Sequence, residues 1–350
     1  MKKIMLWMTV LLMLGAAFVV SVGWIVSKPG YKGPTSKHFN GSTFENPKEV
    51  PSKSFFDVMK WYFQRDQGEW TKIPESEVTF APKPADAVTS GLVVTYVNHS
   101  TFLIQTAGVN ILVDPVWSDR VSPVSFAGPK RFRPAGVKFE DLPPINLVLI
   151  SHNHYDHLDL ETLKKLESEF DPRFVVPLGV DVLLNQEGID DTYPLDWWAS
   201  QPIDSDITIH AVQAQHFSAR GLFDRDKTLW AGYIIETPAG NIYFAGDSGY
   251  GDFFKKIGKK YEIKVGLIPI GAYKPRWFMS PMHVDPEEAI QVHKDVGAEI
   301  SFGMHFGTFP LADDGMNDPA NDFSKALQKP ENRGVNFKLL EEGDSFELKE

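Results

Sequence analysis

Residues 151–159 read Ser-His-Asn-His-Tyr-Asp-His-Leu-Asp, and this short stretch decides the fold. It places four side chains of metal-ligand type, His152, His154, Asp156 and His157, close together in the chain. Imidazole and carboxylate groups at this density are typical ligands of zinc or a similar first-row ion. Ligands separated by one residue cannot all share one face of a helix, so an irregular turn is expected. A histidine-rich surface loop without metal is the alternative, but with only 10 His in the chain the pattern favours a two-metal hydrolase.

The residues on either side of this loop place it at the end of a strand. The apolar run from Ile145 to Ile150 is typical of a buried strand, and Leu160 to Phe170 follows a helical pattern. The loop between them therefore lies at the C-terminal end of a strand, where α/β folds place their sites.

A second metal position needs ligands from elsewhere, because four side chains cannot hold two ions and leave a place for solvent. Three residues follow strand-like runs downstream, namely His216, Asp247 and His305. Each is weak evidence alone, since a single His or Asp at a strand end more often caps it or forms a hydrogen bond. Their order and their common placement at strand ends favour a shared site.

Composition excludes several classes of function. The chain has 46 Asp and Glu against 35 Lys and Arg, a formal net charge of -11, which argues against a nucleic-acid partner. It has no cysteine, which excludes disulfides, thiolate zinc sites and cysteine nucleophiles. With 43% hydrophobic residues it can bury a large core.

The N-terminal segment predicts a membrane anchor. Lys2 and Lys3 precede an uncharged run from Ile4 to Val26, which is long enough to cross a bilayer as a helix. The two lysines predict that this end stays cytoplasmic, with the catalytic domain on the extracytoplasmic side. A cleaved signal peptide is the alternative, because Ser21 and Gly23 are small enough for a cleavage site.

The pattern along the chain predicts three parts. Residues 1–27 are the anchor or an uncleaved signal, residues 28–90 are a linker with an amphipathic helix, and residues 91–350 are the hydrolase domain. The linker is rich in turn formers near Lys28-Pro29-Gly30. The third part alternates short strands with helices, which predicts sheets in the middle and helices outside.

Apolar residues recur at helical spacing between positions 55 and 63. We expect this helix to pack on the core, and the alternative is that it dips into a lipid surface. The apolar positions are Phe55, Phe56, Met59, Tyr62 and Phe63.

With these ligand types in this order, the chain resembles the metallo-β-lactamase superfamily. The resemblance implies an α/β fold, a four-layer αβ/βα sandwich that holds two zinc ions. It implies that Asp247 bridges the ions and that Asp114, in Leu-Val-Asp-Pro, supports the metal loop through hydrogen bonds. Strand termination is the other interpretation of Asp114. The implied ligands are His152, His154 and His216 for one ion, and Asp156, His157 and His305 for the other.

Longer stretches are similar to the N-acylphosphatidylethanolamine phospholipase D family within this superfamily. The similarity covers roughly residues 90–310, and Asn98-His99-Ser100 departs from the family's more usual Gly before the His. It implies cleavage of such lipids to phosphatidic acid and N-acylethanolamine by a hydroxide that the two ions generate. Asp156, Asp247 and His283 are the implied catalytic residues. The matching stretches are Gly128–Arg133, Leu142–Ile145, Leu149–Leu158, Leu195–Trp198, Ile268–Met279 and His283–Glu288.

Two loops are candidates for binding the phospholipid substrate. Lys130 and Arg131 concentrate positive charge suited to a phosphate, although a solvated basic loop or internal ion pairs explain it equally well. Trp277 and Phe278 are suited to an acyl chain, although core packing is the usual role of such residues. His283 is a candidate proton donor or phosphate contact, or else a packed loop histidine.

Other functions stay open at this point. The superfamily reuses one site for many bonds, so a lactonase or a phosphodiesterase acting on a soluble substrate is the alternative enzyme. A non-catalytic membrane-bound binding protein is disfavoured because no ligand position is lost. The expected partners are a phospholipid, a membrane and no nucleic acid, and a homodimer is left open.

Overall fold

Two seven-stranded sheets form the body of the protein in the computed structural model, which describes residues 2–48, 50, 51, 53–78 and 80–349. The first sheet has the order β14-β1-β2-β3-β4-β5-β6 and the second the order β13-β12-β11-β10-β9-β8-β7. The first sheet contains β1 (Leu92–Asn98), β2 (Thr101–Thr106), β3 (Val109–Val113), β4 (Leu147–Leu149), β5 (Arg173–Pro177), β6 (Thr192–Leu195) and β14 (Ser345–Leu348). The second contains β7 (Ser200–Pro202), β8 (Thr208–Val212), β9 (Gly232–Glu236), β10 (Asn241–Phe244), β11 (Ile263–Pro269), β12 (Ile300–Met304) and β13 (Phe337–Lys338).

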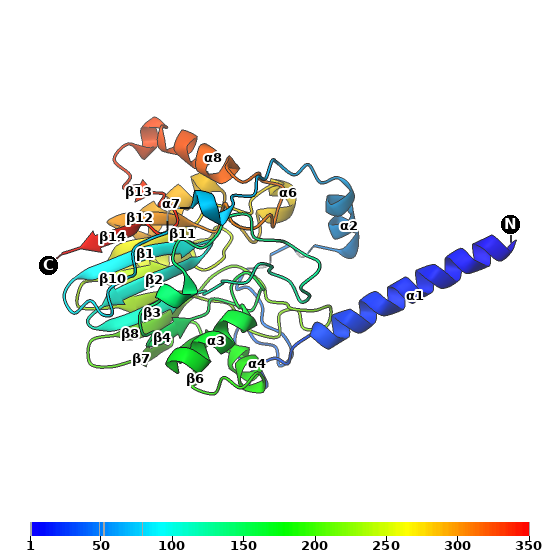
Figure 1. Ribbon diagram of the computed structural model, residues 1–350, viewed down its shortest axis with the longest axis horizontal. Coiled ribbons are helices and arrows are strands. Elements are labelled where there is room, and N and C mark those ends of the chain that lie inside the picture. Colours follow the sequence, from blue (N-terminus) through cyan, green and yellow to red (C-terminus); the bar gives the residue numbers. More distant parts are fainter. Residues whose placement is uncertain (1, 49, 52, 79, 350) are drawn as a thin grey trace.

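Helices cover the outer faces of both sheets (Figure 1). The arrangement confirms the predicted four-layer αβ/βα sandwich. Helices α3 (Leu160–Phe170) and α4 (Val180–Gln186) belong to the first sheet, and α5 (Phe253–Lys260), α7 (Pro286–Val296) and α8 (Asp318–Leu327) to the second. The remaining helices are α1 (Lys2–Val26), α2 (Phe55–Phe63) and α6 (Arg276–Met279), with short 3-10 turns at Glu75–Glu77, Phe139–Asp141 and Pro330–Asn332.

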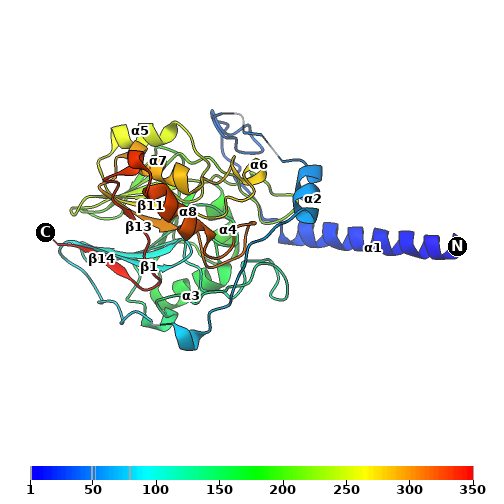
Figure 2. The same cartoon turned by 90° about the horizontal axis from the view of Figure 1, so that it is seen from above.

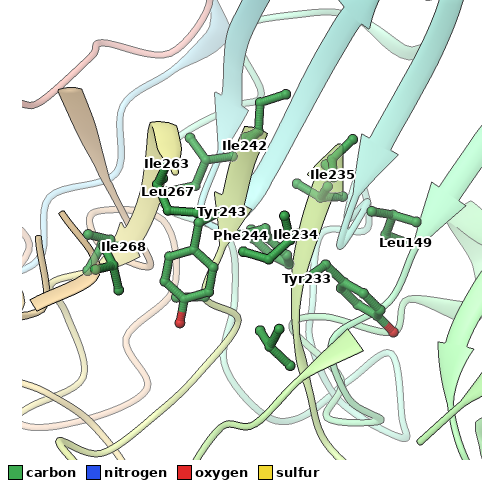
Figure 3. Packing of buried hydrophobic residues seen from close by; sticks show 14 of the residues in the cluster. Leu149, Tyr233, Ile234, Ile235, Ile242, Tyr243, Phe244, Ile263, Leu267 and Ile268 are labelled. Atoms are coloured by element: carbon green, nitrogen blue, oxygen red, sulfur yellow. The ribbon is translucent and has the colours of Figure 1, made fainter. Parts of the chain in front are cut away.

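Successive side chains of a strand point to opposite faces of the sheet, so the first sheet contributes to two apolar layers. In β2, Phe102 and Ile104 belong to the cluster between the sheets, whereas Leu103 belongs to the cluster under the helices. All three are fully buried. Figure 3 shows side chains of β9, β10 and β11 together with Leu149 of the opposite sheet, all of them members of the cluster between the sheets. The sheets are therefore covered on both faces, which explains why their strands read as almost continuous apolar runs.

Helix boundaries follow the expected local signals. Helix α7 begins with a capping box between Asp285 and Glu288, carries Pro286 in its first turn and ends at Gly297 in a left-handed conformation. The helix predicted at residues 160–170 is present with those bounds, and the strand predicted at 145–150 is shorter, at Leu147–Leu149.

The segment before β1 differs from the predicted linker. Phe39 and Phe44 form an isolated bridge and are 1% and 2% exposed, packed against the central core. In contrast, no described residue of α2 is buried, so the expectation that α2 packs on the core is wrong. Helix α1 projects away from the body (Figures 1 and 2).

Helix α1 is the one described helix that is long and apolar enough to cross a membrane, over Met5–Val26. A signal sequence passes the same test of length and composition. Anchoring and its topology remain predictions.

Phe244 in β10 tests the central layer. Truncation of this fully buried ring leaves a cavity between the sheets, so Phe244→Ala is expected to lower the free energy of unfolding by about 3–5 kcal/mol. The measurement is urea unfolding of the full chain in mild detergent. Phe56→Ala is the matched control, because Phe56 is 79% exposed, and it should change stability by less than about 0.5 kcal/mol. Equal losses for the two variants would contradict the packing described.

Candidate metal centre

The strand ends of both sheets meet at one edge and bring the sequence-predicted ligands together. Ser151 to Asp159 follow β4 and Asp247 follows β10. His216 lies beyond β8, and His305 directly follows β12. The ligand atoms fall into overlapping groups whose members lie within 4.8 Å of one another. The first group is His152, His154 and His216, and the second is Asp156, His157 and His305 together with His99; the other two are His152, His157 and Asp247, and His216, Asp247 and His283.

The first group is made of ring nitrogens that face a common point. His154 Nδ1 lies 2.7 Å from His152 Nε2 and 3.3 Å from His216 Nε2. Burial lowers the pKa of His154 to about 3 and the pKa values of His152 and His216 well below their usual range. All three imidazoles are therefore neutral near pH 7, which is the form that binds a metal ion.

The second group combines carboxylates with ring nitrogens. His305 Nε2 lies 3.2 Å from Asp156 Oδ2 and 3.1 Å from Asp247 Oδ2, and His157 Nε2 lies 3.3 Å from each of the same two oxygens. Burial alone would lower the pKa of His305, but the neighbouring Asp247 and Asp156 raise it to about 9. The two carboxylates thus create a strongly negative environment at these rings, which suits a bound cation.

Asp247 links the first and second groups, because it forms one group with His152 and His157 and another with His216 and His283. Its Oδ2 also lies 3.7 Å from His216 Nε2, so it stands between the two sets of histidines. Burial raises the pKa of Asp247, but His157 and His305 together hold it well below its usual range. The preceding Gly246 has a φ of 59°, and a Cβ there would lie 2.7 Å from the Ser151 side chain, so the approach of this loop to the metal loop requires glycine.

Asp114 orients the metal loop, residues 151–159, through hydrogen bonds to its side chains and main chain. Its carboxylate is fully buried and accepts hydrogen bonds from Ser151 N at 2.7 Å and Ser151 Oγ at 2.5 Å. It also lies 2.6 Å from His157 Nδ1. This contact fixes the ring so that Nε2 faces the cluster. The main-chain carbonyl of Met282 lies 3.0 Å from His216 Nδ1 and orients His216 in the same way.

The chemistry of the clustered side chains also suits bound metal ions. Asp247 Oδ1 is buried and has no hydrogen-bond partner within the described part of the chain. A buried polar atom without a partner is unfavourable unless something else binds it. Imidazole and carboxylate donors gathered at one edge therefore suit one or two first-row cations.

His99 is the residue that the sequence reasoning missed. It lies in the turn between β1 and β2 with a φ of 45°, and its Nε2 is 3.1 Å from Asp156 Oδ2. Its main-chain carbonyl also accepts a hydrogen bond from His305 N at 2.7 Å. The signal was its position at a strand end on the same edge, in the stretch Asn98-His99-Ser100.

The two basic candidates for substrate binding, Lys130 and Arg131, differ in their exposure and contacts. Arg131 is 7% exposed and donates hydrogen bonds to the main-chain carbonyls of Val116 and Ser118, so its role here is internal. Lys130 lines a surface cavity of about 520 Å³ that also includes Lys28 and Tyr155. Arg131 lines a different surface cavity, of about 1030 Å³, and the binding of a ligand by either residue stays a prediction.

The second candidate loop lies near the cluster. Trp277 is 43% exposed, and the Phe278 ring stacks on Trp61 with centroids 5.1 Å apart. His283 follows this loop, and its Nδ1 lies 3.8 Å from Asp247 Oδ2. His283 thus joins the edge of the cluster, beside the predicted ligands.

A family model described as "Beta-lactamase superfamily domain" matches residues 109–306. The chain is 38% identical to N-acyl-phosphatidylethanolamine-hydrolyzing phospholipase D 1 of Caenorhabditis elegans, over 78% of this chain and 82% of that protein. It is 34% identical to the mitochondrial protein of the same description from Saccharomyces cerevisiae, over 61% of this chain and 47% of that protein.

Solved structures agree with this match. A metallo hydrolase from the hyperthermophilic archaeon Ignicoccus hospitalis aligns with a TM-score of 0.57 and 25% identity, covering 74% of this chain and 99% of that one.

Substitution of Asp114 tests whether its hydrogen bonds position the metal loop. Asp114→Asn is expected to reduce zinc affinity about 10- to 100-fold, because the amide cannot accept from His157 Nδ1 and from both Ser151 groups as the carboxylate does. Competition with a chromophoric chelator measures the affinity. Asp119→Asn, at an exposed position of the following loop, is the control and should bind zinc as the unmodified chain does. Unchanged affinity in Asp114→Asn would contradict this role.

His99 offers a separate test at the second group. His99→Ala removes a donor to Asp156, so the fully dialysed protein should retain less zinc per chain than the unmodified protein, with affinity reduced about tenfold or more. Elemental analysis after dialysis measures the retained metal. His210→Ala is the control, because His210 lies on β8 against Glu236, away from the cluster. Full retention by His99→Ala would show that Asp156 is positioned without it.

Proposed function

Since the chain belongs to the beta-lactamase superfamily and is a metal-dependent hydrolase, we propose that it is a zinc phosphodiesterase of the phospholipase D type. Its substrates are N-acylphosphatidylethanolamine-like lipids, and its products are phosphatidic acid and N-acylethanolamine. The observation that carries the proposal is the complete His and Asp cluster in a chain 38% identical, over most of its length, to a relative of that named activity.

The residues divide into ligands and supports. We assign His152, His154 and His216 to one zinc ion, Asp156, His157 and His305 to the other, and Asp247 to both. Bound zinc supplies activation of water near neutral pH and charge neutralisation on phosphoryl oxygens. Asp114 holds His157 in the orientation that this requires.

We propose that His283 contacts the phosphoryl group of the substrate. Burial lowers the pKa of His283 to about 4, so its imidazole is neutral near pH 7 and serves as a hydrogen-bond donor rather than as a cation. Its Nδ1 has no partner within the described residues and faces Asp247. Of the two roles expected for this residue, the geometry favours the phosphate contact over the proton donor.

The lipid-binding side of the site is formed by two loops. Lys130 offers a cation to the headgroup from the cavity near Tyr155, and Trp277 offers an exposed indole on α6, the helix that precedes His283. We further propose that residues 91–350 are the catalytic domain and that α1 anchors it to a membrane, with this domain on the extracytoplasmic side.

The decisive experiment is lipid mass spectrometry. The full chain in mild detergent, loaded with zinc, is incubated with N-acylphosphatidylethanolamine, and N-acylethanolamine is expected to form. His216→Ala and Asp156→Asn should lower the rate at least about 100-fold, because each removes a proposed ligand. His210→Ala keeps the same histidine count as His216→Ala and should retain full activity.

Two results would reject the proposal. The absence of N-acylethanolamine above the level of the ligand variants would remove the lipid substrate. Cleavage of a soluble phosphodiester or a lactone by the same preparation would then favour the alternative enzyme. Full activity with about one zinc ion per chain would remove the two-ion assignment.

A further inference from the structure

Helix α2 exposes its apolar side to solvent, which is the reverse of an ordinary surface helix. Phe55, Phe56, Tyr62 and Phe63, called here the aromatic face, are 72%, 79%, 64% and 76% exposed. A helix on a soluble protein normally turns its apolar side to the core. Four aromatic rings gathered on one short helix are unfavourable in water and mark a surface that binds something apolar.

Polar contacts hold α2 in this orientation. Trp61 Nε1 and Arg65 Nε both donate hydrogen bonds to Asp313 Oδ1 at 3.1 Å. Asp313 is buried, and Arg65 also donates to the carbonyl of Ala312 at 2.8 Å. The stacking of Trp61 on Phe278 ties α2 to α6. Rotation of α2 to bury its aromatic face would break these contacts, so the exposure is built into the fold.

The aromatic face lies at the end of the molecule from which α1 leaves the body. Figures 1 and 2 both show α2 near the base of α1, with α2 running across the direction of α1. The base of α1 is fixed to the loop after His216, since Leu222 N donates to Gly23 O at 3.3 Å and Phe223 N to Ser27 Oγ at 3.0 Å. Leu222 and Phe223 are 57% and 48% exposed and add apolar surface beside that exit.

Cations and an indole border the aromatic face. Lys60 Nζ lies 4.8 Å from the centre of the Trp277 ring, and Lys53 Nζ lies 5.7 Å from it and donates to the Trp277 carbonyl at 2.6 Å. Tryptophan and lysine beside an apolar stripe are the composition that prefers the boundary between headgroups and acyl chains. The two lysines complement the negative charge of anionic lipids.

We propose that the aromatic face of α2 docks into the surface of the bilayer that α1 spans, with α6 at its border. The occupant is an anionic lipid bilayer rather than a second copy of the chain. The inference rests on the proposed anchoring by α1 and deepens the proposed function, because it turns the edge that carries His283 toward the lipid. His283 N donates to the carbonyl of Met279 at the end of α6. Helix α6 is therefore joined by one hydrogen bond to a residue at the edge of the cluster.

The absence of cysteine allows a direct test by spin labelling. Phe56→Cys and Phe63→Cys, each labelled with a nitroxide, are prepared in the full chain and reconstituted into vesicles of phosphatidylcholine and phosphatidylglycerol. Ser205→Cys is the control, since Ser205 is exposed in the turn before β8, at the opposite end of that strand from His216. Power saturation with oxygen and with a water-soluble nickel complex reports whether each label lies in lipid or in water.

Both α2 labels are expected to be more accessible to oxygen than to nickel, and the Ser205 label the reverse. Nickel accessibility at positions 56 and 63 equal to that at 205 would overturn the proposal. Spin–spin broadening of the α2 labels at high lipid dilution would also overturn it, because it would identify a second copy as the occupant. The labels report docking whether or not lipid is hydrolysed, so failure of the docking and failure of the proposed function are distinguishable.

Discussion

The buried carboxylate of Asp114 is the constraint on which the metal loop depends. It lies at the end of β3 with a φ of 39°, completely removed from solvent. Burial raises its pKa, and the contacts with His157 and Ser151 oppose that rise. A buried charge is tolerated only when its oxygens are bound, so Ser151 and His157 must remain where they are. The loop between them carries His152, His154 and Asp156, and these bonds fix its conformation.

Three of the strained backbone positions of the described chain lie at the same edge. His99, Asp114 and His305 are non-glycine residues with positive φ, and each lies at the end of a strand that reaches the cluster. Such conformations persist only where the surrounding structure imposes them. Here the hydrogen bond from His305 N to His99 O joins two of these residues directly. The two sheets are thus held together at their site-bearing edge as well as through their apolar layer.

The family resemblance implied the four-layer sandwich, and local signals in the sequence predicted the central sheets and the edge that carries the ligands. Apolar runs located most strands, and residues after those runs located His216, Asp247 and His305. The inverted orientation of α2 was not predictable, since periodicity defines an apolar stripe but not the surface that it faces. The burial of Arg131 was not predictable for a related reason: a basic cluster in the sequence does not reveal which guanidinium donates to main-chain carbonyl groups. The role of His99 also depends on tertiary contacts, because Asp156 is remote from it in the chain.

Arg220 joins the metal loop to the segment that holds α1. Its buried guanidinium donates to the carbonyls of Asn153 and Leu158, at the two ends of the ligand cluster in that loop. Its main-chain N–H donates to Asp224, which also accepts from Lys28 N just after α1. Hydrogen bonds through Asp224 and Arg220 therefore connect the residue after the proposed anchor to the metal loop, without a flexible linker between them. A bilayer that holds α1 would accordingly be fixed in orientation relative to the cluster, so the lipid would reach it from a constant direction.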